Sequence, residues 1–132
     1  MEISLKNKVI IITGGTKGLG KAIAEGASKA GAKIILGGRN TRDGELIVQS
    51  IKESNVGDAI FIEGCLKDVD NCKKLIEAAV KHYGRIDGLV NYAGITSRSS
   101  LLETSEELFD DVLSIIFKSS LFCSKFDLKH ML

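Results

Sequence analysis

The stretch IITGGTKGLGKAIA, residues 11–24, joins an apolar run to a cluster of glycines and then to an alanine-bearing helical pattern. Residues 8–13 (KVIIIT) are rich in β-branched side chains, which is typical of a strand buried on both faces of a sheet. Residues 18–30 (GLGKAIAEGASKA) carry the small side chains of a helix that lies close to a sheet, and Gly31 is expected to end it. The stretch therefore predicts a strand, a glycine loop and a helix in succession.

The rest of the chain repeats this alternation of strand and helix patterns. Further strands are expected at residues 33–36 (KIIL), 59–63 (AIFIE) and 86–91 (IDGLVN). Helices are expected at residues 41–54 and at residues 68–83, where Asp68 would be the N-cap. A last helix is expected from about Ser105 to the end, and Thr104, Ser105, Glu106 and Glu107 form a capping box at its start. Short turns between alternating strands and helices predict βαβ units, and hence a parallel sheet with right-handed crossovers.

Composition limits the classes of function. The 132 residues suffice for one domain with a real core. Eighteen basic and seventeen acidic side chains give a net charge of +1, so nothing in the charge favours nucleic acid or an anionic membrane as a partner. No apolar run approaches the length of a membrane span, and the first residues do not resemble a signal peptide, so we expect a cytoplasmic protein.

Cysteine and histidine are too few and too scattered to predict a metal site. The three cysteines are odd in number, and no two of them form a C-x-x-C pair. The two histidines, His82 and His130, could assist a metal site only with partners that the spacing does not supply. Reduced thiols are the expectation for a cytoplasmic chain of this kind, and no metal is expected.

The glycine loop suits a phosphate-bearing ligand. Gly14 lets the chain turn sharply where the strand ends, Gly18 leaves no Cβ between backbone and ligand, and Gly20 lets the helix pack against the sheet. Free N–H groups and the positive end of the helix dipole then face an anion such as a pyrophosphate. The alternative is a tight turn whose glycines serve packing only.

Three motifs, in this order and spacing, resemble the short-chain dehydrogenase/reductase family. They are the T-G-x-x-x-G-x-G pattern at residues 13–20, the YGRID segment at residues 83–87 and the NYAG segment at residues 91–94. The continuation NYAGIT is most similar to the 3-oxoacyl-acyl-carrier-protein reductase branch. The resemblance implies an α/β fold of Rossmann type: a partial, doubly wound parallel sheet of four strands in order 3-2-1-4 with helices on both faces. Residues 1–132 would then be one NADP(H)-binding domain that stops before the family's fifth strand, which makes it the N-terminal half of such a protein.

Charge at the end of the second strand indicates which nucleotide is bound. NAD enzymes place an acid there for the ribose 2′-hydroxyl, whereas a 2′-phosphate calls for arginine. Here Gly37-Gly38 leads into Arg39 and Asn40, with no acid. The guanidinium of Arg39 suits phosphate, and Lys17 resembles a second basic residue of NADP-preferring family members. The two positions favour NADP(H); the alternative is that both are ordinary surface charges.

By resemblance, the cofactor-binding residues fall into three groups. They are Gly14, Thr16, Lys17, Gly18 and Leu19 on the pyrophosphate side, Arg39 and Asn40 at the 2′-phosphate end, and Cys65, Leu66, Asn91, Ala93 and Gly94 along the adenosine half.

The family's catalytic residues have no counterpart in this sequence. The resemblance implies a tyrosine that protonates the alkoxide, a lysine four residues later and a serine that orients the carbonyl. Tyr83 is followed four residues later by Asp87, and Tyr92 by Thr96, so neither makes Tyr-x-x-x-Lys. We therefore assign no catalytic residue and expect an oxidoreductase fragment without turnover of its own.

Three positions depart from the family pattern: Cys65 stands where an acid is expected, Tyr92 replaces the second asparagine of N-N-A-G, and Ile116 replaces a helix asparagine. Together they favour a degenerate copy or fragment over tolerated variation.

Two other functions compete with this interpretation. The first is a non-catalytic oligomerisation module, because the last helix is rich in apolar residues and the fourth strand would present an open edge. A homo-oligomer, a dimer or larger, is the corresponding expectation. The second is a phosphate- or mononucleotide-binding protein outside redox chemistry, although a P-loop NTPase is excluded because no G-K-[ST] closes the loop.

Overall fold

The structure is a computed structural model, and it describes residues 4–14, 18–91, 101–113 and 119–131. Strands and helices alternate along the chain. In order, the elements are β1 (Val9–Thr13), α1 (Gly18–Lys29), β2 (Lys33–Gly38), α2 (Thr41–Glu53), β3 (Asp58–Glu63), α3 (Val69–Tyr83), β4 (Gly88–Asn91), a 3₁₀ turn (Leu101–Glu103), α4 (Glu106–Leu113) and α5 (Ser119–Met131).

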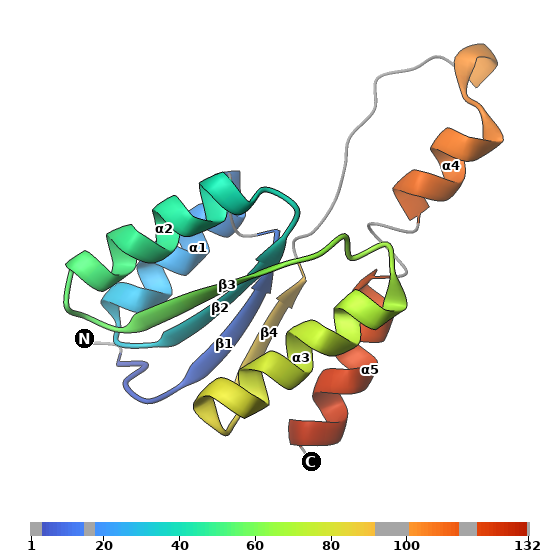
Figure 1. The fold of residues 1–132 in the computed structure, drawn as a ribbon. Helices are drawn as coiled ribbons and strands as arrows, with labels where there is room; N and C mark the ends of the chain where they lie inside the picture. The colour runs from blue at the N-terminus through green and yellow to red at the C-terminus, as the bar shows by residue number, and fades with distance from the viewer. Residues whose placement is uncertain (1–3, 15–17, 92–100, 114–118, 132) are drawn as a thin grey trace.

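The four strands form one parallel sheet in the order β3-β2-β1-β4 (Figure 1). Helices α1 and α2 cover one face of it, and α3 and α5 cover the other (Figure 1). The predicted fold class and strand order are thus confirmed. The predicted ends of the first seven elements lie within about two residues of the observed ones, the usual scatter in helix and strand boundaries.

The continuous apolar runs of the strands are explained by two cores, one on each face. Ile12 and Ile34 belong to the cluster that packs under α1 and α2. Their neighbours Ile11 and Ile35 belong to the cluster under α3 and α5. Because successive side chains of a strand point to opposite faces, a sheet covered on both sides needs apolar residues at every position.

Local signals set the ends of the helices. The carboxylate of Asp68 caps α3 by accepting a hydrogen bond from the backbone N–H of Asp70 at 3.0 Å, as predicted. Gly84 ends the same helix in the left-handed conformation, with φ +78°. Gly31, just beyond α1, has φ +101° and ends that helix as predicted.

The C-terminal part of the chain differs from the prediction in two ways. In place of one helix from about Ser105, the structure describes two, α4 and α5, and residues 114–118 between them lie outside the described part. The cap of α4 is Ser105 and not Thr104, since the Ser105 hydroxyl accepts a hydrogen bond from the N–H of Leu108 at 3.0 Å. The expected capping box is therefore out of register by one residue. Helix α4 stands away from the sheet (Figure 1).

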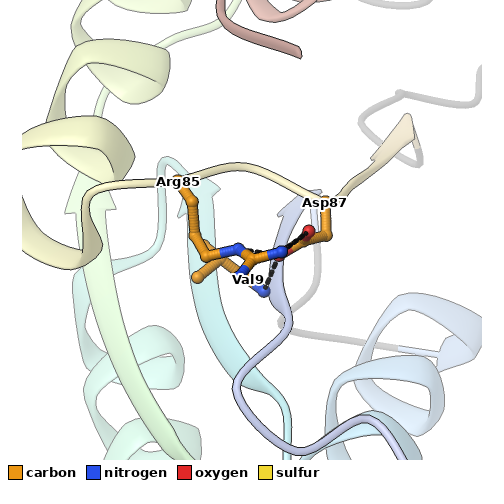
Figure 2. A network of polar contacts seen from close by, with 3 residues as sticks. All are labelled: Val9, Arg85 and Asp87. Atoms are coloured by element: carbon orange, nitrogen blue, oxygen red, sulfur yellow. Dashed lines mark hydrogen bonds and ion pairs between the residues drawn. The ribbon is translucent and has the colours of Figure 1, made fainter.

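The N-terminal edge of the sheet is fastened by the carboxylate of Asp87, in the turn before β4 (Figure 2). It accepts a hydrogen bond from the backbone N–H of Val9 at 2.9 Å, and the N–H of Asp87 donates to the Val9 carbonyl at 2.8 Å. Arg85 donates to the same carboxylate from Nε at 2.9 Å and from Nη2 at 2.6 Å. These bonds hold the start of β1 beside the start of β4. Within the described ranges, no helix has the length and apolar character needed to cross a bilayer.

Candidate functional site

The carboxyl ends of all four strands meet at one edge of the sheet. Thr13 at the end of β1 is level with Gly37 of β2 and with Asn91 of β4, and Gly38 is level with Glu63 of β3. The ends of these strands and the segments that follow them hold every predicted cofactor residue that the structure describes. The site predicted from the sequence thus falls along a single edge, which is where parallel α/β sheets bind their ligands.

Gly14 makes the turn that the sequence predicted for it. Its φ is +72°, a conformation that glycine adopts at little cost and that other residues avoid. Its N–H donates to the carbonyl of Gly37 at 2.7 Å, so this amide continues the ladder between β1 and β2. Amides for an anion must therefore come from residues beyond Gly14, where the loop passes into α1.

Helix α1 begins at Gly18, with its N-terminus at this same edge. The first amides of an α-helix have no acceptor within the helix, so the first turn offers N–H donors and the positive end of the dipole. Leu19 lies in that turn with 60% of its side chain exposed, while Gly20 is buried toward the sheet. The start of α1 thus has a packed side and an open side.

The end of β2 provides a positive charge. Arg39 follows the strand and is exposed. The side chain of Asn40 caps α2: its Oδ1 accepts from the N–H of Asp43 at 3.1 Å and its Nδ2 donates to Asp43 Oδ2 at 2.9 Å. Because this side chain is already engaged in the cap, Arg39 is the freer of the two for a ligand.

The end of β3 is more buried than the sequence suggested. The Leu66 side chain lies in the core under α3, with 4% exposed, so it can meet a ligand only through its backbone. Cys65 is half-buried. Its carbonyl accepts from Asn71 Nδ2 at 3.0 Å and from the N–H of Asp68 at 3.1 Å, which fixes the turn into α3.

Asn91 at the end of β4 is held by a residue that the sequence analysis missed. Its Nδ2 donates to the hydroxyl of Ser124 on α5 at 3.1 Å. The two residues are 33 positions apart, and no motif marks the serine. Only the packing of α5 beside β4 reveals that the last helix supports this edge.

Four predicted cofactor residues, Thr16, Lys17, Ala93 and Gly94, lie outside the described residues, as do Tyr92 and Ile116. In the part of the chain that the structure describes, no three His, Cys, Asp or Glu side chains gather where they could hold a metal ion.

Tyr83 lies far from this edge and has a structural partner. Its hydroxyl donates to Asp58 Oδ2 at 3.0 Å, and Asp58 is the first residue of β3. Burial and this hydrogen bond raise the pKa of Tyr83 above its usual range. A phenol so placed cannot deliver a proton at the carboxyl ends of the strands.

The edge therefore presents three kinds of polar group: the first amides of α1 after β1, a guanidinium after β2, and an amide side chain at the end of β4 that is held by Ser124. Nothing among the described side chains there combines a nucleophile with a base.

Comparison with known proteins gives a consistent result. A family model described as short chain dehydrogenase matches residues 8–132. An uncharacterized oxidoreductase of Listeria monocytogenes is 40% identical over 119 residues, which cover 90% of this chain and 48% of that protein. The chain spans about half the length of the curated relatives it matches.

Solved structures share the fold over nearly the whole chain. L-Sorbose reductase from Gluconobacter frateurii, complexed with NADPH and L-sorbose, is 26% identical, with a TM-score of 0.93 over 99% of this chain and 50% of that one. The NADH-dependent reductase A1-R′ complexed with NAD is 32% identical, with a TM-score of 0.86 over 96% of this chain and 52% of that one. From the family match, the relatives and the glycine turn at the carboxyl edge, the chain belongs to the short-chain dehydrogenase family.

Proposed function

We propose that this chain is the NADP(H)-binding portion of an oxidoreductase that acts on carbonyl or hydroxyl substrates, and that by itself it binds the nucleotide without turning it over. The observation that carries the proposal is the carboxyl edge of the sheet, where the left-handed turn at Gly14, the start of α1 and the exposed Arg39 follow adjacent strands. A helix N-terminus suits the diphosphate of a dinucleotide, and a cation beside it suits the 2′-phosphate on the neighbouring ribose.

The residues fit the nucleotide along its length. The diphosphate would lie against the first-turn amides of α1, because glycine at the turn lets the backbone approach closely. Arg39 would pair with a 2′-phosphate through its planar fork of donors. No acid occupies residues 37–40 to receive a ribose 2′-hydroxyl. The related solved structures include complexes with NADPH and with NAD, so the preference for NADP(H) rests on this chain's own residues.

The bound nicotinamide would supply or accept a hydride. Among the residues that the structure describes, no side chain at this edge is placed to donate the proton. Tyr83 is committed to Asp58 at the opposite edge. Neither Tyr83 nor Tyr92 is followed by lysine four residues later. We infer that the chain binds and orients the nucleotide but does not complete proton transfer.

Ligand-dependent melting of the pure chain tests the binding claim. A ligand that binds only the folded state raises the melting temperature by mass action, so NADPH should raise it and ATP should do so only weakly at equal concentration. NADH is the matched control, since it lacks only the 2′-phosphate. The absence of any shift at millimolar NADPH would rule out the binding claim, and a larger shift with ATP would favour a mononucleotide-binding protein. Oxidation of NADPH by the chain with a ketone would refute the claim of no turnover.

A second candidate, association with a further copy of the chain, is favoured by exposed apolar side chains on the last two helices. On α5, Leu121 and Leu128 are each 54% exposed and Met131 45%. On α4, Phe109 is 56% exposed and Leu113 46%. In the described sheet, β4 pairs only with β1, so no strand lies along its other side. We therefore propose a homodimer or larger assembly, and a monodisperse monomer by light scattering would refute it.

A further inference from the structure

Two cysteines that are not joined by a disulfide lie in the core beneath the helices that cover one face of the sheet. Cys72 lies on α3 and Cys123 on α5. Their exposed fractions are 1% and 0%, and both belong to the apolar cluster beneath these two helices. Helices α3 and α5 lie side by side there (Figure 1). Two thiols that are distant in sequence thus share one enclosed space.

Both thiols lie in one buried apolar cluster, on two helices that pack against each other. The Cys72 Sγ also donates to the carbonyl of Leu66 at 3.3 Å, which fixes its position. The pKa of Cys123 lies above its usual range, first through a hydrogen bond with the Cys72 thiol, then through burial, the charge of Cys72 and the charge of Asp127. Two buried thiols in one cluster on packed helices are placed as a disulfide requires, since that bond joins residues whose Cα atoms lie about 4.4 to 6.8 Å apart.

We propose that Cys72 and Cys123 form an intramolecular disulfide when the chain meets a low-molecular-weight disulfide such as oxidised glutathione. One cysteine thiolate attacks a glutathione sulfur and releases the other glutathione as a thiol, leaving a mixed disulfide. The second cysteine thiolate then attacks the protein sulfur of the mixed disulfide and releases the second glutathione thiol. In sum, two protein thiols are oxidised, one glutathione disulfide is reduced, and both protein protons end on glutathione.

Burial of the two thiols should make this reaction slow. A buried thiol with a raised pKa is a poor nucleophile, because only the thiolate attacks. The oxidant therefore reaches the pair when α5 opens from α3, and the pair closes into a disulfide when the helix returns. Cys65 is half-buried at the end of β3 and is the competing thiol.

The disulfide would act on the candidate site through the next residue of α5. Ser124 follows Cys123 and accepts the hydrogen bond of Asn91 at the end of β4. A covalent link from α3 to α5 holds Ser124 against Asn91, and reduction leaves this contact to packing alone. The pair is thus a redox-controlled clamp on the helix that supports the carboxyl edge.

Mapping the disulfide in folded and unfolded chain tests the proposal. The whole chain is treated with oxidised glutathione in native buffer and in urea, the remaining thiols are alkylated, and non-reduced peptides are analysed by mass spectrometry. The folded chain should give the Cys72–Cys123 link and leave Cys65 alkylated or bound to glutathione. In urea, Cys65–Cys72 should prevail, because the shorter loop closes at lower entropic cost. The same pairing in both conditions, or a folded chain whose Cys72 and Cys123 stay reduced, would overturn the proposal.

Melting temperature gives a second readout, measured first on a variant that keeps the buried pair intact. In Cys65→Ser only Cys72 and Cys123 remain, and oxidation should raise the melting temperature by about 5 to 15 °C, reversibly with dithiothreitol. The matched double variant Cys65→Ser/Cys123→Ala should show no rise after the same treatment. An oxidised Cys65→Ser chain that melts no higher than its reduced form would contradict the clamp.

Discussion

The two edges of the sheet are built in opposite ways. At the N-terminal edge, side chains are bonded to one another and to backbone. Asp87 bonds to Val9 and Arg85 (Figure 2), and Tyr83 bonds to Asp58. At the carboxyl edge, Asn40 and Asn91 are also hydrogen-bonded within the chain, but Leu19 and Arg39 are exposed. The carboxyl edge therefore differs in presenting an exposed cation beside the first amides of α1, which have no acceptor within the helix. Substitutions at the first edge should therefore change stability, and substitutions at the second should change binding.

The largest effect on stability is expected for Gly57→Ala, just before β3 at the N-terminal edge. Gly57 has φ +74°, and an added Cβ would lie 2.5 Å from the carbonyl oxygen of Ala32 and 2.8 Å from that of Ser28. Left-handed strain and collision with backbone should together lower the free energy of unfolding by about 3 kcal/mol. Urea denaturation followed by circular dichroism measures this loss.

Gly84→Ala is the matched control, because Gly84 has φ +78° but open space around the site of an added Cβ. Gly84→Ala should lower the free energy of unfolding only by the cost of left-handed backbone strain, about 1 kcal/mol. Equal losses for the two variants would show that the close contact with Ala32 and Ser28 has no energetic weight.

Asp87→Ala should have the next largest effect. It leaves the buried N–H of Val9 without its carboxylate acceptor, which should cost about 2 kcal/mol at pH 7. The hydrogen bonds of Arg85 are the main cause that lowers the pKa of Asp87 in the folded protein. A lowered folded-state pKa gives stability above the unfolded pKa of about 4, which is lost as the pH falls through the folded value.

The difference between the parent chain and Asp87→Ala should accordingly shrink below about pH 4. Nucleotide affinity of the folded variant should match that of the parent by calorimetry. If Asp87→Ala lost nucleotide affinity but not stability, the assignment of stability to the N-terminal edge and of binding to the carboxyl edge would be wrong.

Arg39→Ala tests the opposite edge. The side chain is exposed, so stability should change by less than about 0.5 kcal/mol. Affinity for NADPH should fall about tenfold, the value of one charge-assisted phosphate contact, while affinity for NADH should stay the same. Isothermal titration with both nucleotides measures the difference. An equal loss of affinity for both would show that Arg39 does not bind the 2′-phosphate.

Asp127→Asn gives the smallest expected change, a gain in stability. Asp127 on α5 is 3% exposed, and its Oδ1 is without a hydrogen-bond partner among the described residues. Burial raises the pKa of this carboxyl, and the charge of His130 partly offsets the rise. A raised folded-state pKa means that stability is full below the unfolded pKa of about 4 and is lost as the pH rises through the folded value.

Asp127→Asn keeps the shape of the side chain and removes its charge. At pH 7 it should stabilise the chain by about 1 kcal/mol, and near pH 4 the gain should vanish. Urea denaturation at the two pH values measures it. A gain that does not depend on pH would show that the charge of Asp127 is not what weakens α5.

The fold could be predicted because its signals are local. Uninterrupted apolar runs such as residues 8–13 require a sheet covered on both faces, and Asp68 and Gly31 mark helix ends by their own chemistry. The position of the candidate site followed from the same pattern, since parallel strands bring their carboxyl ends together. The sequence could not show that Ser105 and not Thr104 caps α4, because both hydroxyls suit the sequence pattern.

The remaining features depend on contacts between distant residues. The bond between Asn91 and Ser124 and the meeting of Cys72 with Cys123 both require α5 to pack beside β4 and α3. The burial of Leu66 depends likewise on α3 lying over the end of β3. No residue nearby in sequence carries a signal for any of these, so only the structure reveals them.

The hydrogen bond from the Gly14 amide to the Gly37 carbonyl has a consequence for selectivity by length. It ties the turn after β1 to the end of β2, the strand that leads into Arg39, and since only three residues separate Gly14 from α1, it keeps the start of α1 near the end of β2. A nucleotide that reaches both must have a matching span between its diphosphate and its ribose substituent. In the proposed complex, this spacing would add a requirement on the length of the ligand to the requirement on its charge.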